Sequence, residues 1–155
     1  MKRWIAIMLA GCLVWVLAAC NTNAVADIDP AQTAQKLYQT IAFTDELSPL
    51  ENDAALRAYG LSADTVEACS VYVGSGATAE EIAVFKAVDE NAVKTITDAA
   101  NARIQDRINA FANYVPGELT KLKAAEVKSR GKYVILCIAD DSAKASQEAD
   151  QILRG

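Results

Sequence analysis

The sequence predicts an α+β domain with a four-stranded, mostly antiparallel sheet. Two pairs of short stretches rich in β-branched residues, each pair interrupted by glycine, predict two β-hairpins. Between the pairs lies a long stretch with an apolar residue every three or four positions, which is typical of an amphipathic helix. Helical patterns also precede the first hairpin and follow the second. We therefore expect two hairpins joined by a long amphipathic helix and flanked by N- and C-terminal helices.

Two helices are expected before the first hairpin. Asp29-Pro30 combines an N-cap residue with proline at the first helical position, so one helix should begin there and end near Phe43. Its apolar residues share one face: Ala34, Leu37, Tyr38, Ile41 and Ala42. Ser48 and Glu51 have the spacing of a capping box, which predicts a second, short helix from Ser48 to the C-cap residue Gly60.

The first hairpin is expected around the Gly74-Ser75-Gly76 turn. Residues 70–73 are β-branched or aromatic in the main, and residues 82–88 follow the turn. Thr78 and Glu81 also fit a capping box, which would make residues 82–88 helical. We favour a strand, because the β-branched residues of this segment fit a pleated surface.

The long helix is expected to begin at Asp89 and to end before Pro116-Gly117. Its apolar stripe is Val93, Ile96, Ala100, Ile104, Ile108, Phe111 and Val115. After it, a hairpin around Arg130-Gly131 is predicted, with Ser129 opposite Lys132. The expected core face of this hairpin is Ala125, Val127, Val134, Leu136 and Ile138. Asp140 or Asp141 can cap a last helix, whose packing stripe is Ala145, Ala149, Ile152 and Leu153.

The N-terminal residues 1–19 have the pattern of a signal peptide. Lys2 and Arg3 precede sixteen uncharged residues, which as a helix would span about 24 Å, short of the ~30 Å hydrocarbon core. The ending Leu17-Ala18-Ala19-Cys20 resembles the lipobox of bacterial lipoproteins. This resemblance implies the addition of diacylglycerol, with acyl chains such as palmitate, to the Cys20 thiol, and cleavage before Cys20. Residues 20–28 would then be the lipidated cysteine and a short tether, and residues 29–155 a single domain.

A second lipobox-like sequence must be weighed against the first. Leu9-Ala10-Gly11-Cys12 fits the same pattern, but cleavage there would leave the apolar residues 13–17 at the mature N-terminus. Cys20 is therefore favoured as the lipidation site. The same N-terminal stretch could instead act as an uncleaved anchor helix or direct plain secretion without a lipid.

The charge of the chain bears on its partners. The formal net charge is −5, and loss of residues 1–19 would remove two basic residues and make it −7. An acidic surface disfavours nucleic acid and anionic lipid head groups, because phosphate recognition needs clustered Lys and Arg. We expect no nucleic-acid partner and attachment to the membrane through the lipid on Cys20.

Three segments of the chain carry a family resemblance. They are residues 81–85 (EIAVF), residues 114–116 (YVP) and residues 131–134 (GKYV). With them, the chain resembles a family of uncharacterised bacterial lipoproteins, a domain-of-unknown-function family found chiefly in Gram-positive anaerobes. The likeness spans roughly residues 31–153. It implies the fold and an extracytoplasmic address on the outer face of the cytoplasmic membrane, and it supplies no catalytic residue.

The residues that usually carry catalysis or bind metals are scarce in this chain. It has no histidine, so Ser-His and Cys-His pairs and histidine-based metal sites are excluded. Cys69 and Cys137 would be the thiols left after cleavage and lipidation, too few for a zinc site. Alternation places the two thiols on opposite faces of the sheet, where they are too far apart to form a disulfide. A disulfide between them is the alternative. We expect no metal and no cofactor.

Two groups of residues are candidates for binding. Arg103 and Arg107 lie one helical turn apart and could together hold a carboxylate or phosphate, or else form salt bridges on a solvated face. Tyr133 and Ile135 place apolar area, together with Cys137, on the sheet face opposite the hairpin core. This patch is either covered by the N-terminal helices or exposed to a partner.

Several further polar residues are expected to have structural roles. Glu80 and Glu81 are neighbours on a strand and should point to opposite faces at a solvated strand entrance. Residues 74–76 could offer backbone amides to an anion, but a turn explains them better.

The sequence is thus that of a lipid-anchored envelope protein, and we expect a non-catalytic module that binds an envelope protein, a peptide or a small ligand. One alternative is an enzyme that acts on wall or peptide substrates without histidine. Another is a structural accessory subunit of a membrane complex.

Overall fold

A computed structural model describes residues 27–155 of the chain. The predicted signal peptide and Cys20 lie outside the described residues. In chain order the elements are α1 (Pro30–Thr40), β1 (Ser48–Pro49), α2 (Asn52–Tyr59), β2 (Val66–Val73), β3 (Glu81–Ala87), α3 (Glu90–Phe111), the 3-10 helix η1 (Pro116–Glu118), α4 (Leu119–Ala124), β4 (Val127–Arg130), β5 (Tyr133–Ile138) and α5 (Ser142–Arg154).

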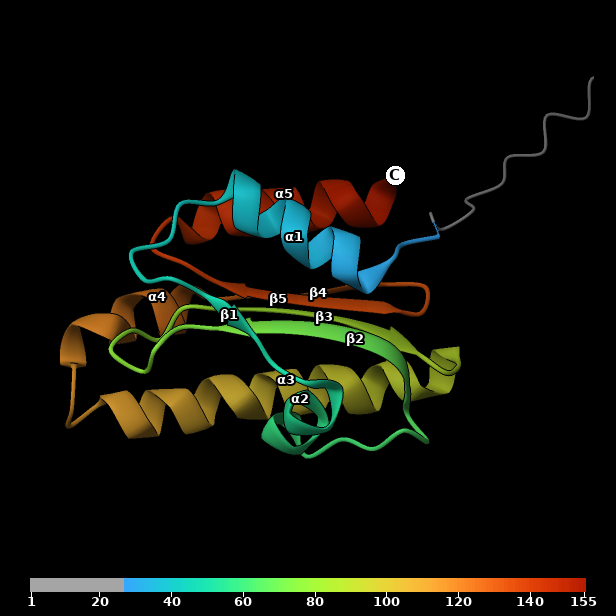
Figure 1. Cartoon of the computed structure of the whole chain (residues 1–155), viewed down its shortest axis with the longest axis horizontal. Helices are drawn as coiled ribbons and strands as arrows, with labels where there is room; N and C mark the ends of the chain where they lie inside the picture. Colours follow the sequence, from blue (N-terminus) through green and yellow to red (C-terminus); the bar gives the residue numbers. More distant parts are fainter. Residues whose placement is uncertain (1–26) are drawn as a thin grey trace, which may run out of the picture.

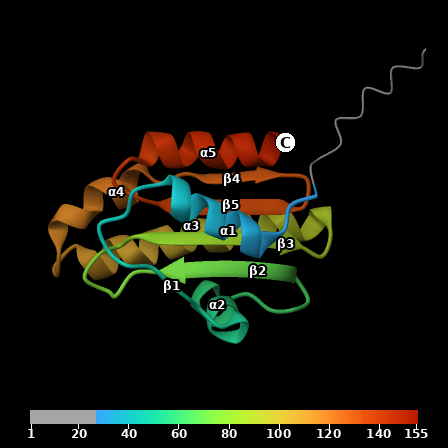
Figure 2. The ribbon, with the colours of Figure 1, turned by 45° about the horizontal axis from the view of Figure 1, so that its top comes forward.

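The domain has three layers, with one sheet between two layers of helices (Figure 1). The five strands follow the order β1-β2-β3-β5-β4, and all neighbouring strands are antiparallel. Helices α2 and α3 pack on one face, and α1 and α5 lie side by side on the other (Figure 2). The predicted α+β class is confirmed, but the predicted count of four strands is wrong because β1 adds a fifth strand at the edge.

The prediction that Ser48 and Pro49 start a helix is wrong. They pair instead with Val73 and Tyr72 of β2, and the amide of the next residue, Leu50, donates to the Val71 carbonyl at 2.8 Å. Proline is compatible with an edge strand because its missing N–H removes no bond from the sheet interior. Helix α2 consequently begins only at Asn52, although it ends at Gly60 as predicted, with Gly60 at φ 63°.

The first hairpin is confirmed, and the segment after its turn is a strand. Strand β2 begins at Val66, four residues before the predicted start. Strand β3 lies between β2 and β5 under helices on both faces, and six of its seven residues are buried. This explains why its sequence is an apolar run without polar alternation, since neither face meets water.

The second hairpin is confirmed with a different register. Ser129 lies opposite Val134, and Arg130 lies opposite Tyr133, which is a shift of two residues from the predicted pairing. A shift of two preserves the side-chain faces, because strand side chains alternate with a period of two. The turn is made by Gly131 and Lys132, with Gly131 in the left-handed region at φ 56°.

The predicted caps of α1 and α3 are confirmed. Asp29 accepts a hydrogen bond from the Gln32 amide, and Asp89 accepts one from the Ala92 amide. The long helix ends at Phe111, earlier than its apolar stripe suggested, and η1 and α4, which the sequence did not predict, lead into the second hairpin. Helix α1 also ends early, at Thr40.

The sheet separates two hydrophobic cores. Phe85, Val134, Leu136 and Ile138 pack towards α2 and α3, with the buried stripe of α3. Leu37 and Ile41 pack with α5 residues against the other face. There they meet the patch of Tyr133, Ile135 and Cys137, so this patch is covered and not exposed.

Substituting Phe85 tests the larger core. Its ring is fully buried and lies edge-on to Tyr59, with 4.9 Å between the ring centroids. We expect Phe85→Ala to lower the free energy of unfolding by about 3–5 kcal/mol, because it removes buried apolar surface and leaves a cavity. Tyr114→Ala, at a ring 70% exposed, is the control and should cost at most about 0.5 kcal/mol. Urea denaturation followed by circular dichroism measures both, and equal losses would contradict the packing.

Candidate functional site

Two adjacent carboxylates, Glu80 and Glu81, are fully buried where β3 begins, each with 0% exposure. Their side chains lie on opposite faces of the sheet, as predicted from alternation. The predicted solvated position is wrong for both. An ionised carboxylate without water is very costly unless cations and hydrogen-bond donors surround it, so each of these residues requires a network.

Glu81 lies on the face covered by α2 and α3. The Arg103 guanidinium binds it in bidentate fashion, with Nε 3.1 Å from Oε1 and Nη2 2.9 Å from Oε2. The Tyr59 hydroxyl of α2 donates to Oε1 at 2.6 Å. Arg107, one turn further along α3, has its Nε 3.9 Å from Oε2. Glu81 therefore links strand β3 to both helices of its layer.

The protonation states in this cluster follow from burial and charge. Burial, together with the Glu81 charge, raises the pKa of Tyr59 well above 10, so its hydroxyl stays a donor. Burial opposes the charge of Arg103, but its hydrogen bonds and attraction to Glu81 outweigh burial and raise its pKa. For Arg107, burial dominates and lowers the pKa despite the nearby Glu81.

Arg107 is less completely paired than Arg103. Its Nη2 donates to the Thr78 carbonyl at 3.2 Å. Its Nε is the one buried side-chain nitrogen or oxygen in the described part of the chain that has no hydrogen-bond partner. The guanidinium lies over the ring of Phe111, 4.8 Å from the centroid, and that of Arg103 lies 5.6 Å from the Tyr59 centroid. These stacked contacts hold both cations in place.

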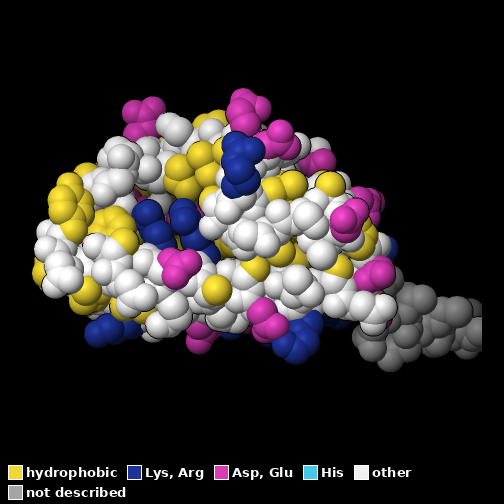
Figure 3. All heavy atoms as spheres, turned by 90° about the horizontal axis from the view of Figure 1, so that it is seen from below, with side chains coloured by type: hydrophobic (Ala, Val, Ile, Leu, Met, Phe, Trp, Pro, Cys, Tyr) yellow, Lys and Arg dark blue, Asp and Glu magenta, His cyan; other side chains and the backbone are white. Residues whose placement is uncertain are grey.

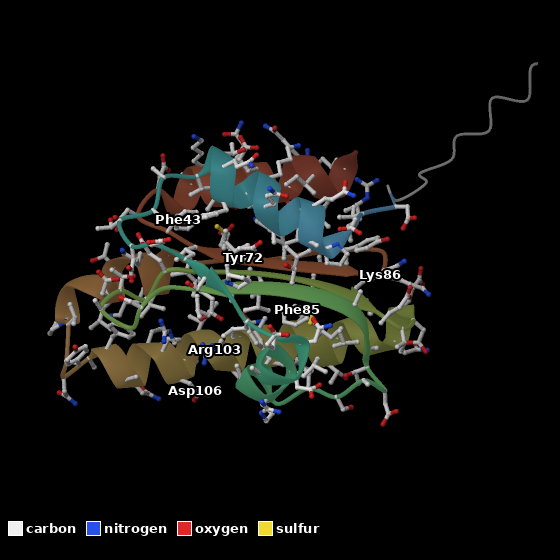
Figure 4. All side chains as sticks on the ribbon, in the orientation of Figure 1. Phe43, Tyr72, Phe85, Lys86, Arg103 and Asp106 are labelled. Atoms are coloured by element: carbon white, nitrogen blue, oxygen red, sulfur yellow. The ribbon has the colours of Figure 1, made fainter. Side chains whose placement is uncertain are left out.

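Both arginines also reach the surface. Their side chains are 19% and 18% exposed, for Arg103 and Arg107 respectively. In Figure 4, Arg103 lies between α3 and the sheet, whereas Asp106 lies on the outer side of the helix. Figure 3, which views this helical face, shows basic side chains in a hollow beside hydrophobic ones. The structure thus brings together the two arginines singled out in the sequence and exposes part of each.

Glu80 lies on the opposite face, within a second network. It accepts hydrogen bonds from the backbone amides of Thr44, at 3.0 Å to each oxygen, and of Asp45, at 2.8 Å. Lys121 of α4 places its Nζ 3.2 Å from Oε1. These contacts fix the chain after α1 and the start of α4 at the same end of the sheet.

Lys121 is itself surrounded by three carboxylates. Its ammonium lies 2.8 Å from Asp140, 3.1 Å from Glu118 and 3.2 Å from Glu80. Burial would lower its pKa, but the hydrogen bonds to Asp140, Glu118 and Glu80 together raise it, so this lysine stays charged. Asp140 is thereby committed to Lys121, and Asp141 caps α5 by accepting from the Lys144 amide.

The turn at residues 74–76 is occupied by a side chain of the protein itself. Asp45 accepts hydrogen bonds at 2.7 Å from both the amide and the hydroxyl of Ser75, and at 3.2 Å from the Thr78 hydroxyl. A Cβ at Gly74 would lie 2.8 Å from the Asp45 carboxylate, so a larger residue there would require this side chain to move. The donors that could have bound an external anion hold Asp45 in place.

Tyr133 and Ile135, also candidates from the sequence, lie apart from the arginines. Both are buried on the opposite face of the sheet, under α1 and α5. The Tyr133 hydroxyl donates to Asp27 at 2.6 Å and accepts from the Ile28 amide at 3.1 Å. In the structure, Tyr133 therefore attaches the start of the domain to the sheet.

Cys69 and Cys137 are free thiols on opposite sides of the sheet. Burial raises the pKa of Cys137 to about 12, and burial also raises that of Cys69. Within residues 27–155, no three His, Cys, Asp or Glu side chains are grouped so that they could hold a metal ion. No helix in the same residues combines the length and apolar character needed to cross a membrane.

Sequence reasoning considered Glu80 and Glu81 but placed them in solvent, and it did not identify Lys121 or Tyr59 as their partners. One local signal could have raised the question of burial, since the two glutamates directly precede the apolar run of β3 with no turn residue between. No local signal identifies their partners, which lie 22 to 41 residues away in the chain.

Comparison with known proteins places the chain in a family. The model of the family described as Domain of unknown function (DUF4358) matches residues 39–139, which is more than half of the chain. The chain therefore belongs to this family. No curated protein and no solved structure matches it.

The Glu81 network can be tested by Glu81→Gln. The substitution keeps the shape but removes the charge that compensates Arg103, so we expect the free energy of unfolding to fall by about 3 kcal/mol. Glu46→Gln, at an exposed glutamate, is the matched control and should change it by less than about 0.5 kcal/mol. Thermal and urea denaturation measure both, and a loss no larger than that of the control would contradict the network.

Timed alkylation with iodoacetamide at pH 8 tests the burial of the two thiols. With a pKa of about 12, roughly one Cys137 in ten thousand is a thiolate at this pH, and the side chain is also buried. We expect Cys137 to react only on global unfolding in guanidinium, and the half-buried Cys69 to react faster in the folded protein. Peptide mass spectrometry distinguishes the sites, and fast labelling of folded Cys137 would contradict its placement.

Proposed function

We propose that this DUF4358 protein is a lipoprotein, held by an acylated Cys20 on the outer face of the cytoplasmic membrane, and that it works there as a non-catalytic binding module. The observation that carries the proposal is the spacing between the lipobox-like Leu17-Ala18-Ala19-Cys20 and the point where the domain begins. Only residues 21–26 separate Cys20 from Asp27.

The first described residues are attached to the domain by specific contacts. Asp27 accepts the hydrogen bond of Tyr133, and its carboxylate lies 3.6 Å from the Lys86 ammonium. The Tyr133 hydrogen bond, with the Lys86 charge, lowers the pKa of Asp27, so the carboxylate is ionised at neutral pH. Six residues reach about 20 Å when fully extended and average roughly 14 Å if flexible. An acyl anchor at Cys20 would therefore keep the domain close to the bilayer.

The attachment also gives the anchored domain a direction. Helix α1 starts at one end of the sheet, and α4 lies at the opposite end (Figure 1). With the tether leaving beside Tyr133, the end that carries α4 and the C-terminus of α3 would point away from the membrane. The acidic net charge supports the same arrangement, because it disfavours adhesion of the domain to anionic lipid.

Binding is favoured over catalysis by the state of the reactive groups. A general acid or base must exchange a proton with a bound substrate, which requires access. Glu80 and Glu81 are fully buried and engaged with cations and donors of the fold. Lys121 and the Tyr59 hydroxyl are committed to the same carboxylates. In the Glu81 network, the guanidinium groups of Arg103 and Arg107 stay partly exposed, and such groups suit recognition of an anion.

The anchor can be tested by metabolic labelling with an alkyne palmitate analogue in a Gram-positive host, followed by mass spectrometry of the N-terminal peptide. We expect the label on a peptide that begins at Cys20, and its loss in Cys20→Ala. Cys12→Ala is the matched control, since Leu9-Ala10-Gly11-Cys12 has the same pattern, and it should keep the label. An N-terminus at Met1, or a label lost in Cys12→Ala and kept in Cys20→Ala, would contradict the proposal.

A further inference from the structure

We propose that Arg103 and Arg107 bind a carboxylate group of a peptide, while Tyr114 binds the apolar side chain next to it. The inference deepens the proposed binding role by naming a site and a ligand class. It does not depend on the lipid anchor.

The charge of the cluster is the first argument. Two guanidinium groups face one buried carboxylate, Glu81, so Glu81 by itself balances only one of the two positive charges. Arg103 takes both oxygens of Glu81, which leaves the Nε of Arg107 at 3.9 Å without a hydrogen bond. Because this Nε is buried, a ligand would bind through the partly exposed remainder of the guanidinium group.

The free donors are the second argument. A guanidinium has five N–H donors, and neither Arg103 nor Arg107 uses its Nη1 in a hydrogen bond to any described residue. Both side chains are partly exposed, and Figure 3 shows basic side chains in a hollow of this face. Stacking on Tyr59 and Phe111 holds the two groups in position, so little side-chain entropy is lost when a ligand binds.

The aromatic side chains beside the arginines are the third argument. Arg107 lies over Phe111, and Phe111 contacts Tyr114 edge-on, with 6.3 Å between the ring centroids. Tyr114 is the large hydrophobic side chain left exposed, at 70%, in the described residues. The buried Phe111 ring thus connects the partly exposed Arg107 to the exposed ring of Tyr114. A carboxylate with an adjacent apolar group matches this pairing of a cation with an exposed ring.

A carboxylate fits the site better than a phosphate. A carboxylate carries a single negative charge, and its planar pair of oxygens matches the guanidinium fork. Glu118 lies close enough to Arg107 to raise its pKa, and Asp106 lies close enough to Arg103 to do the same. A phosphate dianion would bring a second negative charge towards these carboxylates, and like charges repel.

The test is isothermal titration calorimetry on the full-length chain in detergent micelles. The probes are N-acetyl-Phe-Ala with a free C-terminus, its amide, N-acetyl-Phe-Glu-amide and phenyl phosphate. We expect saturable binding of the free acid, and binding of the amide weaker by at least about tenfold. If the glutamate peptide binds, the site accepts a side-chain carboxylate. If only the free acid binds, the site is specific for a C-terminal carboxylate. Binding of either peptide supports the site.

The variants test which residues bind. Arg107→Gln should weaken binding by at least about tenfold, and Arg107→Lys should also weaken it because lysine lacks the planar fork. Arg57→Gln, at an exposed arginine of α2, is the matched control and should leave binding unchanged. Tyr114→Ala should weaken binding severalfold, and it tests the site even if Arg107→Gln does not fold, since Tyr114 is mostly exposed.

Three results would overturn the inference: no saturable binding of either carboxylate peptide, unchanged binding in folded Arg107→Gln, or tighter binding of phenyl phosphate than of the carboxylates. Labelling of Cys20 is measured separately. A labelled protein that binds no carboxylate contradicts the site alone, and an unlabelled protein that binds it contradicts the anchor alone.

Discussion

The burial of two adjacent carboxylates at the start of β3 is the constraint on which the arrangement of the domain depends. Because β3 is central and helices cover both faces of the sheet, neither Glu80 nor Glu81 can reach water. Each must therefore be compensated by a cation that reaches it on its own face. Arg103 supplies the charge on one face and Lys121 on the other, so α3 and α4 are held against the same end of the sheet.

The two networks are built alike but differ in how completely they are paired. Glu80 is satisfied by backbone amides and by Lys121, whose charge three carboxylates share. Two cations face Glu81, and the less completely paired one, Arg107, is partly exposed beside an aromatic pair. A network whose donors are all paired stabilises the fold, whereas one with free donors can also recognise a ligand. This difference is why the functional proposal rests on the α3 face.

The contacts at the start of the domain would also set its orientation relative to the membrane. Tyr133 lies in the sheet, and its hydroxyl binds both Asp27 and the Ile28 amide, so the chain is fixed to the fold before α1 begins. A short tether from that point would hold one end of the sheet towards an anchoring surface. The end with Tyr114 and α4 would then face outward. Tyr133, which the sequence pattern placed in an apolar patch of the sheet, has this positional role in the structure.

The sequence by itself determined the features that depend on local periodicity. The apolar spacing of α3, the alternation in both hairpins, the caps at Asp29 and Asp89 and the stop at Gly60 all follow from short-range rules, and each matches the structure. The opposite faces of Glu80 and Glu81 follow from the same alternation. Even the register error of the second hairpin left its faces correct, because a shift of two residues leaves an alternating pattern unchanged.

Tertiary structure alone decided what depends on distant partners. Strand β1 has two residues, too few to show any period, and it exists because the edge of β2 accepts its hydrogen bonds. The burial of Glu80 and Glu81, the pairing of Arg103 with one of them and the incomplete pairing of Arg107 require residues brought together from separate elements. The local sequence shows which side chains can be charged. The packing of the helices on the sheet determines which of these charges are buried and must be neutralised, and which stay accessible to a ligand.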